Sequence, residues 1–316
     1  MSKRIVFAEP IGLNKFKAEN FKAEMQKHGF DVVYYDTVPV SQSDLQQRIQ
    51  GADVLVLSNH PIAAKTLQAC PTLKLISVAF TGVDHVPLDY CKEHAIAVCN
   101  AAGYSTTAVA ELTLALAIAL LRKVVPMDAI TRNGGTRNGF LGGELAGKTF
   151  GIVGFGAIGQ RVAQLTLAYG CRVVVHTRTP KPSSDVSFIN LDELFSISDI
   201  VSLHLPATQQ TVGIVNRRLI SLMKPTSLLI NTARGSIVDC LALSQALEQG
   251  QIAGAAIDVY EHEPPIETDH PLLKAPNTIL LPHIAYATSE AIDKRSDIVM
   301  DNIRSWILQK PQNVIV

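Results

Sequence analysis

The chain has 316 residues, 47% of them hydrophobic, and this length exceeds one ordinary domain, so we expect two domains with sizeable cores. Lysine and arginine together number 28, as do aspartate and glutamate, and this balance disfavours binding to nucleic acid or to a membrane surface. The cysteines form no C-x-x-C pair, which disfavours a metal site or a disulfide framework and favours the reducing cytoplasm; they stand at positions 70, 91, 99, 171 and 240.

The first part of the chain alternates apolar, β-branched runs with helical segments. The expected strands are 4–9, 31–36, 52–58, 73–80 and 96–100. The opening MSKRIVFAEP has too short an apolar run for a signal peptide. This alternation predicts a parallel sheet with helices on both faces.

A second series of the same kind follows a buried helix. The run LTLALAIALL at 112–121 is too short to span a bilayer, so we expect a helix over 107–121 that is buried on most faces. A glycine-rich stretch at 132–148 then separates it from the next strands. These are expected at 149–155, 173–177, 200–206, 227–233, 255–260 and 278–283, with a closing helix from about 289 to 308.

The glycine motif GFGAIG follows the first strand of the second series and directly precedes a helix. Its glycines are Gly154, Gly156 and Gly159, with Ala157 and Ile158 between the last two. Glycines at this spacing let the backbone turn tightly, approach a pyrophosphate and pack helix on strand. A glycine-rich turn can also serve packing alone, but the placement between strand and helix favours a dinucleotide site.

Arg234, Glu263 and His283 each follow an expected strand of the second sheet. Taken singly, each has a structural explanation: a solvated arginine, a glutamate in a polar loop, and a histidine beside proline. Loops at the carboxyl ends of parallel strands form the ligand crevice, however, so we expect the three side chains at one site. Together they offer a fork for a substrate carboxylate, a general acid/base and a carboxylate partner for the imidazole.

The chain resembles the D-isomer-specific 2-hydroxyacid dehydrogenases over essentially its full length. The motifs that carry the resemblance are TGVDHVPLDYC (81–91), NAAGYSTTAVAEL (100–112), GFGAIG, HLPAT (204–208), NTARGSIVD (231–239), AAIDVYEHEP (255–264) and LPHIA (281–285). The resemblance implies an α/β fold of two doubly wound parallel-sheet domains. A flavodoxin-like substrate domain would comprise 1–98 and 285–316, and a Rossmann dinucleotide-binding domain would comprise 99–284. It also implies a homodimer built partly on the 107–121 helix.

The resemblance further implies roles for individual residues. Arg234 would hold the carboxylate and carbonyl oxygen of a 2-oxo acid, His283 would protonate that oxygen, and Glu263 would orient His283. The substrate carboxylate would also meet the backbone of Thr81, Gly82 and Val83. The remaining expected cofactor contacts are Thr107, His204, Pro206, Thr232, Ala233 and Asp258, with Asp258 at the nicotinamide amide. Leu112 replaces a histidine that many relatives carry, a departure that bears on helix packing.

Dinucleotide folds usually carry an acidic residue about 20 residues past the glycines, where the strand VVVHT ends here. That acidic residue binds the 2′-hydroxyl of the NAD ribose and repels the 2′-phosphate of NADP. Here Thr177, Arg178 and Thr179 stand at that place, with Lys181 close behind. A guanidinium fork matches a 2′-phosphate, so we expect NADP to be preferred over NAD. The alternative is that Arg178 is a solvated loop residue and NAD is used.

Ser58-Asn59 and the sequence from His283 to Tyr286 look most similar to glycerate dehydrogenases and hydroxypyruvate or glyoxylate reductases. We therefore expect a small 2-oxo acid as the substrate. A lactate-type or phosphoglycerate-type dehydrogenase using NAD remains open as an alternative. So does a non-catalytic, nucleotide-sensing protein like the corepressors that share this fold. A dehydrogenase of non-acid alcohols is disfavoured, since it would leave the Arg234 carboxylate site unfilled.

Overall fold

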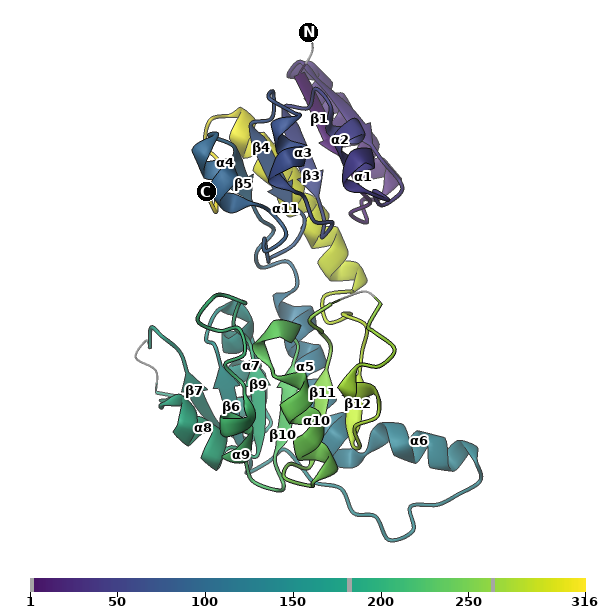
Figure 1. Ribbon diagram of the computed structural model, residues 1–316, viewed down its shortest axis with the longest axis vertical. Coiled ribbons are helices and arrows are strands. Elements are labelled where there is room, and N and C mark those ends of the chain that lie inside the picture. Colours follow the sequence, from purple (N-terminus) through teal and green to yellow (C-terminus); the bar gives the residue numbers. More distant parts are fainter. Residues whose placement is uncertain (1–2, 181–183, 263–264) are drawn as a thin grey trace. The chain divides into compact units, whose positions relative to one another are not determined.

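The computed structural model describes residues 3–180, 184–262 and 265–316 (Figure 1). The chain divides into two compact units, Met1–Ser105 with Ala287–Val316, and Thr106–Tyr286. The sequence placed these divisions at 98/99 and 284/285. The first division falls later because Asn100 and Ala101 still donate backbone hydrogen bonds within the first unit, to Asn313 and Phe80.

The first unit is a parallel sheet whose strands follow the order β2-β1-β3-β4-β5. This is the strand order of flavodoxin-like folds, as expected. Its strands are β1 (Lys3–Phe7), β2 (Phe30–Tyr34), β3 (Val54–Leu57), β4 (Leu75–Val78) and β5 (Ala97–Cys99). Its helices are α1 (Lys15–Lys27), α2 (Gln42–Ile49), α3 (Ala64–Gln68), α4 (Leu88–Glu93) and the closing α11 (Ser289–Ile307).

The second unit is also a parallel sheet, in the order β12-β11-β10-β9-β6-β7-β8. Its strands are β6 (Thr149–Val153), β7 (Arg172–His176), β8 (Ser187–Phe188), β9 (Ile200–Leu203), β10 (Leu228–Asn231), β11 (Gly254–Ile257) and β12 (Thr278–Leu280). Counted within the unit and read from β8, the order begins 3-2-1-4-5-6, which is that of the Rossmann fold. The expected fold class is therefore confirmed.

Helices cover both faces of the second sheet, because its strands alternate their side chains between two hydrophobic clusters. Leu229 of β10 packs with α8 (Leu191–Ile197), α9 (Arg217–Ser221) and α10 (Cys240–Glu248), whereas Leu228 and Ile230 pack with α5 (Thr106–Arg122) and α7 (Ala157–Ala168). The other helices of this unit are α6 (Val124–Arg132) and the 3₁₀ turns η1 (Gly235–Ile237) and η2 (Pro271–Leu273).

The helix expected at 107–121 is α5, and its apolar composition follows from what it contacts. It packs against α7 and against β10, β11 and β12. Its buried side chains are Ala108, Val109, Ala110, Thr113, Leu114, Leu116 and Ala117. Among the described residues, no helix combines the length and apolar character that crossing a membrane requires.

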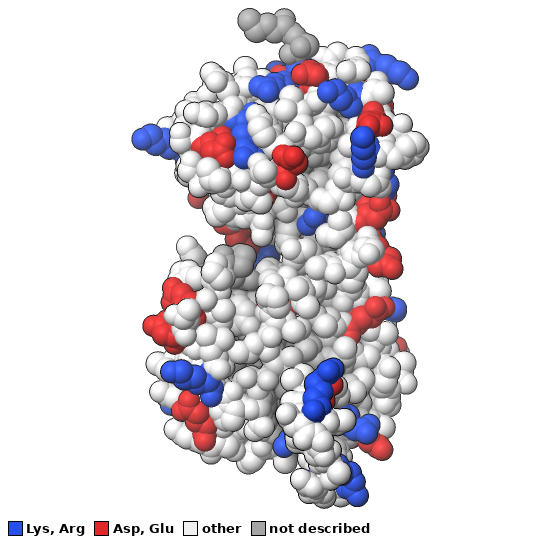
Figure 2. Space-filling model, turned by 90° about the vertical axis from the view of Figure 1, so that its right-hand side faces the viewer, with Lys and Arg blue, Asp and Glu red and all other residues white. Residues whose placement is uncertain are grey.

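Charged side chains of both signs are interspersed on the face shown in Figure 2. On this face, basic and acidic side chains stand next to one another in small groups.

Candidate active site

The glycine motif forms the turn between β6 and α7. Gly154 has a φ of 97°, in the left-handed region, and a Cβ there would collide with the backbone of His204. A Cβ on Gly159 would collide with the Gly154 carbonyl, so this glycine permits α7 to pack on β6. A Cβ on Gly156, in contrast, would meet no described atom within 4 Å outside its own neighbours in the chain. The motif is therefore tightly packed on the protein side and open at its middle glycine.

The open side of this turn is the N-terminus of α7, which begins at Ala157. The first N–H groups of an α-helix have no partner within the helix and attract anions. Gly156 is the N-cap and contributes no side chain, so a ligand phosphate can approach these N–H groups directly. The residues present fit a dinucleotide pyrophosphate at this turn.

The ends of β7 and β9 flank the same turn. Gly154 N–H donates to the His176 carbonyl (2.8 Å), and His204 N–H donates to the Val153 carbonyl (2.7 Å). These bonds bring the residues after β7 and after β9 to opposite sides of the glycine turn. From β6 the chain first adds strands on the β7 side and then adds β9 on the other side, so the strand order reverses here. Ligands of open α/β sheets bind at this switch point.

Thr177 and Arg178 directly follow β7. Thr177 is half-buried, and Arg178 and Thr179 are exposed. The Arg178 guanidinium lies 3.5 Å from Gln210 Oε1, which is at the outer limit of hydrogen bonding. Arg178 thus stands in solvent beside the dinucleotide turn, and Lys181 lies outside the described residues.

His204 follows β9 and is neutral. Its Nε2 lies 2.8 Å from Ser202 Oγ. Desolvation lowers the pKa of His204 to about 3, so the ring is uncharged at neutral pH. Pro206, two residues on, accepts a hydrogen bond from Thr211 Oγ1 (2.6 Å). Ser202 was missed by the sequence analysis, although a serine within a fully buried strand is a signal that it needs a polar partner.

The residues expected for catalysis follow three strands that end in register. Asn231 of β10 pairs with Ile257 of β11, and Ile257 pairs with Leu280 of β12. Arg234 comes three residues after the first of these strand ends, and His283 three residues after the last. The segments that carry both residues therefore leave the sheet at one edge, and the expected meeting of the side chains at one site stays a prediction.

The Arg234 loop is held by the side chain of Asn231. Its amide donates to the Arg234 carbonyl (2.9 Å) and accepts from the Ala233 N–H (3.0 Å). A Cβ on Gly235 would collide with the Tyr260 backbone, so this loop packs directly on the segment after β11. Thr232, also expected at the cofactor, shares a hydrogen bond with Thr113 Oγ1 (3.1 Å). Arg234 itself is half-buried.

His283 has a φ of 56°, in the left-handed region, which costs a residue other than glycine about 1–2 kcal/mol. The next two residues are tied to Asp258, whose carboxylate oxygens accept from the N–H groups of Ile284 and Ala285 (2.8 Å each). Asp258 is completely buried. The His283 ring also contacts Tyr286 edge to face, at 5.4 Å between ring centroids.

Asp258 therefore holds the backbone of the two residues that follow His283, a role that was not predicted from the sequence. Its expected contact with the nicotinamide amide stays a prediction. Glu263 lies outside the described residues, so its pairing with His283 also stays a prediction.

The expected substrate-binding turn lies in the first unit, after β4. Asn100 Nδ2 donates to the Thr81 carbonyl (2.7 Å), and Val86 N–H donates to the Val83 carbonyl (3.0 Å). Asn100 was not predicted as a site residue; it directly follows β5, much as Asn231 is the last residue of β10. Thr107 is exposed in the first turn of α5.

Residues 114–285 match the family model described as the D-isomer specific 2-hydroxyacid dehydrogenase, NAD binding domain. A glyoxylate reductase of Thermococcus litoralis is 36% identical over 272 residues, which cover 82% of each chain. A glycerate dehydrogenase of Methylorubrum extorquens is 34% identical across 100% of this chain and 99% of its own. A solved structure described as an acyclic imino acid reductase in complex with NADPH and D-Arg superposes with a TM-score of 0.90, at 30% identity, over 99% of this chain and 100% of that one.

The fold, the glycine turn and these relatives define a nicotinamide-dependent oxidoreductase of 2-oxo and 2-hydroxy acids. The chain belongs to the D-isomer specific 2-hydroxyacid dehydrogenase family. The resemblance read from the sequence is thereby confirmed, as is the expectation that the chain is an enzyme.

Proposed function

We propose that this enzyme uses NADPH to reduce a small 2-oxo acid, either glyoxylate or hydroxypyruvate, to the 2-hydroxy acid. The observation that carries the proposal is the common edge from which the Arg234 and His283 segments leave the sheet, in the same unit as the dinucleotide turn. The names of the relatives, glyoxylate reductase and glycerate dehydrogenase, support the substrate class.

Each residue of the set has one role in the proposed reaction. When bound, the reduced nicotinamide supplies the hydride that adds to the carbonyl carbon. Arg234 binds the substrate carboxylate with its planar fork and orients the carbonyl. His283 donates its proton to the carbonyl oxygen as that oxygen becomes an alcohol, and Glu263 stabilises the protonated imidazole. The backbone N–H groups of Thr81, Gly82 and Val83, also proposed to bind substrate, belong to the first unit.

The preference for NADPH rests on Arg178. Thr177 and Arg178 follow β7, where an aspartate or glutamate would repel a 2′-phosphate, and no negative charge stands at either position. The exposed guanidinium can turn to a phosphate because, among the described residues, its one hydrogen-bond contact is the long one with Gln210. The family description names NAD and the solved relative holds NADPH, so the chain's own residues carry this part of the proposal.

We also propose a cytoplasmic homodimer. On α6, which follows α5, Val124 and Val125 are 50% and 55% exposed, and Leu141 beyond it is 81% exposed. Apolar side chains gathered along adjoining segments favour a protein partner. All the cysteines, at positions 70, 91, 99, 171 and 240, are free and buried, which suits a reducing compartment.

A panel of 2-oxo acids tests the proposed function. The purified protein is supplied with NADPH or NADH and with glyoxylate, hydroxypyruvate, pyruvate, phosphohydroxypyruvate or a branched 2-oxo acid, and loss of reduced cofactor is followed. We expect the highest kcat/KM with NADPH and one of the first two acids. Fastest turnover of pyruvate or of the phosphorylated acid would instead assign the lactate or phosphoglycerate class. No turnover of any acid would support the nucleotide-sensing alternative.

A further inference from the structure

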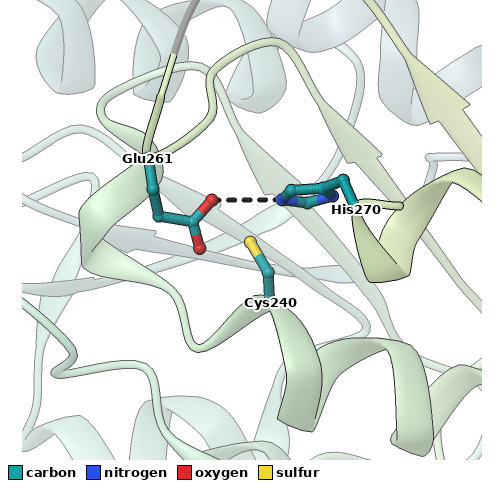
Figure 3. Close-up of side chains that lie close together, drawn as sticks. All are labelled: Cys240, Glu261 and His270. Carbon is teal, nitrogen blue, oxygen red and sulfur yellow. Dashed lines mark hydrogen bonds and ion pairs between the residues drawn. The ribbon is translucent and has the colours of Figure 1, made fainter. Parts of the chain in front are cut away.

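A cysteine, a glutamate and a histidine meet beside the N-terminus of α10 (Figure 3). Cys240 is the first residue of this helix, whereas Glu261 and His270 lie in the segment between β11 and η2. One ligand atom from each, the Cys240 Sγ, a Glu261 carboxylate oxygen and a His270 ring nitrogen, lie within 4.8 Å of one another. None of the three has a role in the reaction proposed above.

The spacing of these atoms suits a tetrahedral metal ion. His270 Nε2 and Glu261 Oε2 are 3.1 Å apart. Nitrogen and oxygen ligands at 2.0–2.1 Å from zinc stand about 3.3 Å apart in a tetrahedron, and a thiolate sulfur stands about 3.6 Å from either. Because all three atoms lie within 4.8 Å of one another, the sulfur has to move by at most about 1.2 Å to close the site.

The surrounding residues hold two of the ligands rigidly and leave a way in. Asp239 caps α10 by accepting from the Ala242 N–H (2.9 Å), which fixes the backbone that carries Cys240. The His270 ring packs edge to face on Tyr260 at 5.5 Å between ring centroids. The Glu261 side chain is 35% exposed, and a cavity of about 360 Å³ adjoins all three residues. An ion can thus reach the cluster from solvent.

We propose that Cys240, Glu261 and His270 bind one zinc-class divalent cation, with a water molecule as the fourth ligand. Thiolate, imidazole and carboxylate together are a donor set that zinc accepts. Metal binding displaces the thiol proton of Cys240 to solvent, and the ring proton of His270 moves from Nε2 to Nδ1 so that the neutral imidazole coordinates through Nε2. The proposal is independent of the substrate and of the cofactor preference.

Without metal, the same side chains form a hydrogen-bonded group. His270 Nδ1 accepts from the Leu272 N–H (3.3 Å), so Nε2 carries the proton and donates it to Glu261. Burial, together with Glu261, raises the pKa of the Cys240 thiol, which argues against a reactive thiolate here. Coordination through Nε2 gives up the long bond to Leu272 and replaces the Nε2 hydrogen bond with a metal bond.

Titration with Co²⁺ tests the site, because tetrahedral Co²⁺ absorbs visible light and a cobalt–thiolate bond adds a charge-transfer band in the near ultraviolet. The full-length, tag-free protein, stripped of metal with a chelator, is titrated with Co²⁺ and then with Zn²⁺. We expect one Co²⁺ per chain, both absorption signals, and loss of both when Zn²⁺ displaces the cobalt. Absence of a charge-transfer band even at about 1 mM Co²⁺, a concentration at the weak end of the dissociation constants of protein sites for divalent cations, would overturn the proposal.

Variants locate the site. Cys240→Ser should abolish the charge-transfer band, and Glu261→Gln should weaken Co²⁺ binding at least tenfold without affecting folding, since this side chain is partly exposed. The matched control is Cys171→Ser, which alters another buried free cysteine, one whose thiol donates to the Leu145 carbonyl. Its titration should match that of the unmodified protein. A band that persists in Cys240→Ser, or binding unchanged in Glu261→Gln, would show that the metal binds elsewhere.

Discussion

Asp258 holds His283 in place through the backbone: its carboxylate accepts the N–H groups of the two residues that follow the histidine, each at 2.8 Å. The bonds join loops that follow neighbouring strands, β11 and β12, and they stabilise the left-handed backbone of His283. A fully buried carboxylate that makes such bonds contributes both to stability and to the placement of the imidazole.

Replacing Asp258 by asparagine tests this relationship. The amide keeps the shape but turns an NH₂ group toward a backbone N–H, so we expect a loss of about 1–3 kcal/mol in the free energy of unfolding. We also expect kcat to fall at least tenfold, because the imidazole is displaced. Urea denaturation and steady-state kinetics measure the two effects.

Asp199→Asn is the matched control. Asp199 also accepts a backbone N–H, that of Thr149 (2.8 Å), but at the start of β6, the opposite end of the strands. This variant should lose stability and keep kcat. Equal losses of kcat in both variants would mean that Asp258 acts only on folding.

Arg234→Ala should lower kcat/KM for the 2-oxo acid by roughly 10²–10³-fold, the usual effect of removing a group that binds developing charge. Arg234→Lys should recover little, since an ammonium lacks the planar fork. Arg217→Ala removes an exposed arginine that bonds to Gln245 and should leave the rate unchanged. Full activity in Arg234→Ala would refute the proposed carboxylate site.

His283→Ala should lose roughly 10²–10⁴-fold in kcat, the range for a positioned proton donor, while binding of NADPH measured by fluorescence is retained. Glu263→Gln should shift the pH–rate profile of reduction toward lower pH. Reduction needs the protonated imidazole, and without the carboxylate that form persists only at lower pH. A profile identical to that of the unmodified enzyme would show that the two side chains do not interact.

Arg178→Ala should reduce the ratio of kcat/KM for NADPH to kcat/KM for NADH, mainly by raising KM for NADPH. High salt should reduce the same ratio in the unmodified enzyme, because it screens the contact between the guanidinium and the phosphate. Thr177→Asp should move the preference toward NADH by adding the missing negative charge. Arg161→Ala, which alters a half-buried arginine on α7 that bonds to Gln164, is the control and should leave the ratio unchanged. An unmodified enzyme that uses NADH equally well would contradict the proposed phosphate site.

The ion pair between Glu24 on α1 and Arg304 on α11 predicts a pH-dependent stability. Arg304 donates to the carboxylate from Nε (2.9 Å) and Nη2 (2.7 Å) and thereby lowers the pKa of Glu24. The pair's contribution is therefore fully present above the ordinary value of 4.5 and is lost as pH falls through the lower, folded-state pKa.

Glu24→Gln should thus destabilise the protein at pH 7 by up to about 1 kcal/mol, since the pair is partly exposed, and the difference should vanish at strongly acidic pH. Thermal unfolding as a function of pH measures it. Glu19→Gln, on the same helix, alters an exposed carboxylate 4.0 Å from Lys15 and should have little effect at either pH. A constant difference between Glu24→Gln and the unmodified protein across this range would exclude the ion pair as its cause.

The sequence predicted both sheets because their strands carry local signals: the LLIN of β10 and the GAAI of β11 are buried throughout. The short β8 and helix α6 were not predicted, since SF is too brief to show a period and α6 has no fully buried residue. The bonds from Ile284 and Ala285 to Asp258, which follow the left-handed His283, join positions 26 and 27 apart in sequence, and no local pattern reveals them. The cluster of Cys240, Glu261 and His270 also joins residues that are far apart in sequence, so the absence of a C-x-x-C pair could neither predict nor exclude it.

Isotope transfer tests the central claim most directly. NADPH deuterated at the transferred position of the nicotinamide is mixed with hydroxypyruvate and the enzyme, and the glycerate formed is analysed by NMR and for its chirality. The proposed reaction places deuterium on C2 of D-glycerate, one atom per NADPH consumed. Glycerate without deuterium at C2, or NADPH that is consumed without formation of a 2-hydroxy acid, would contradict it.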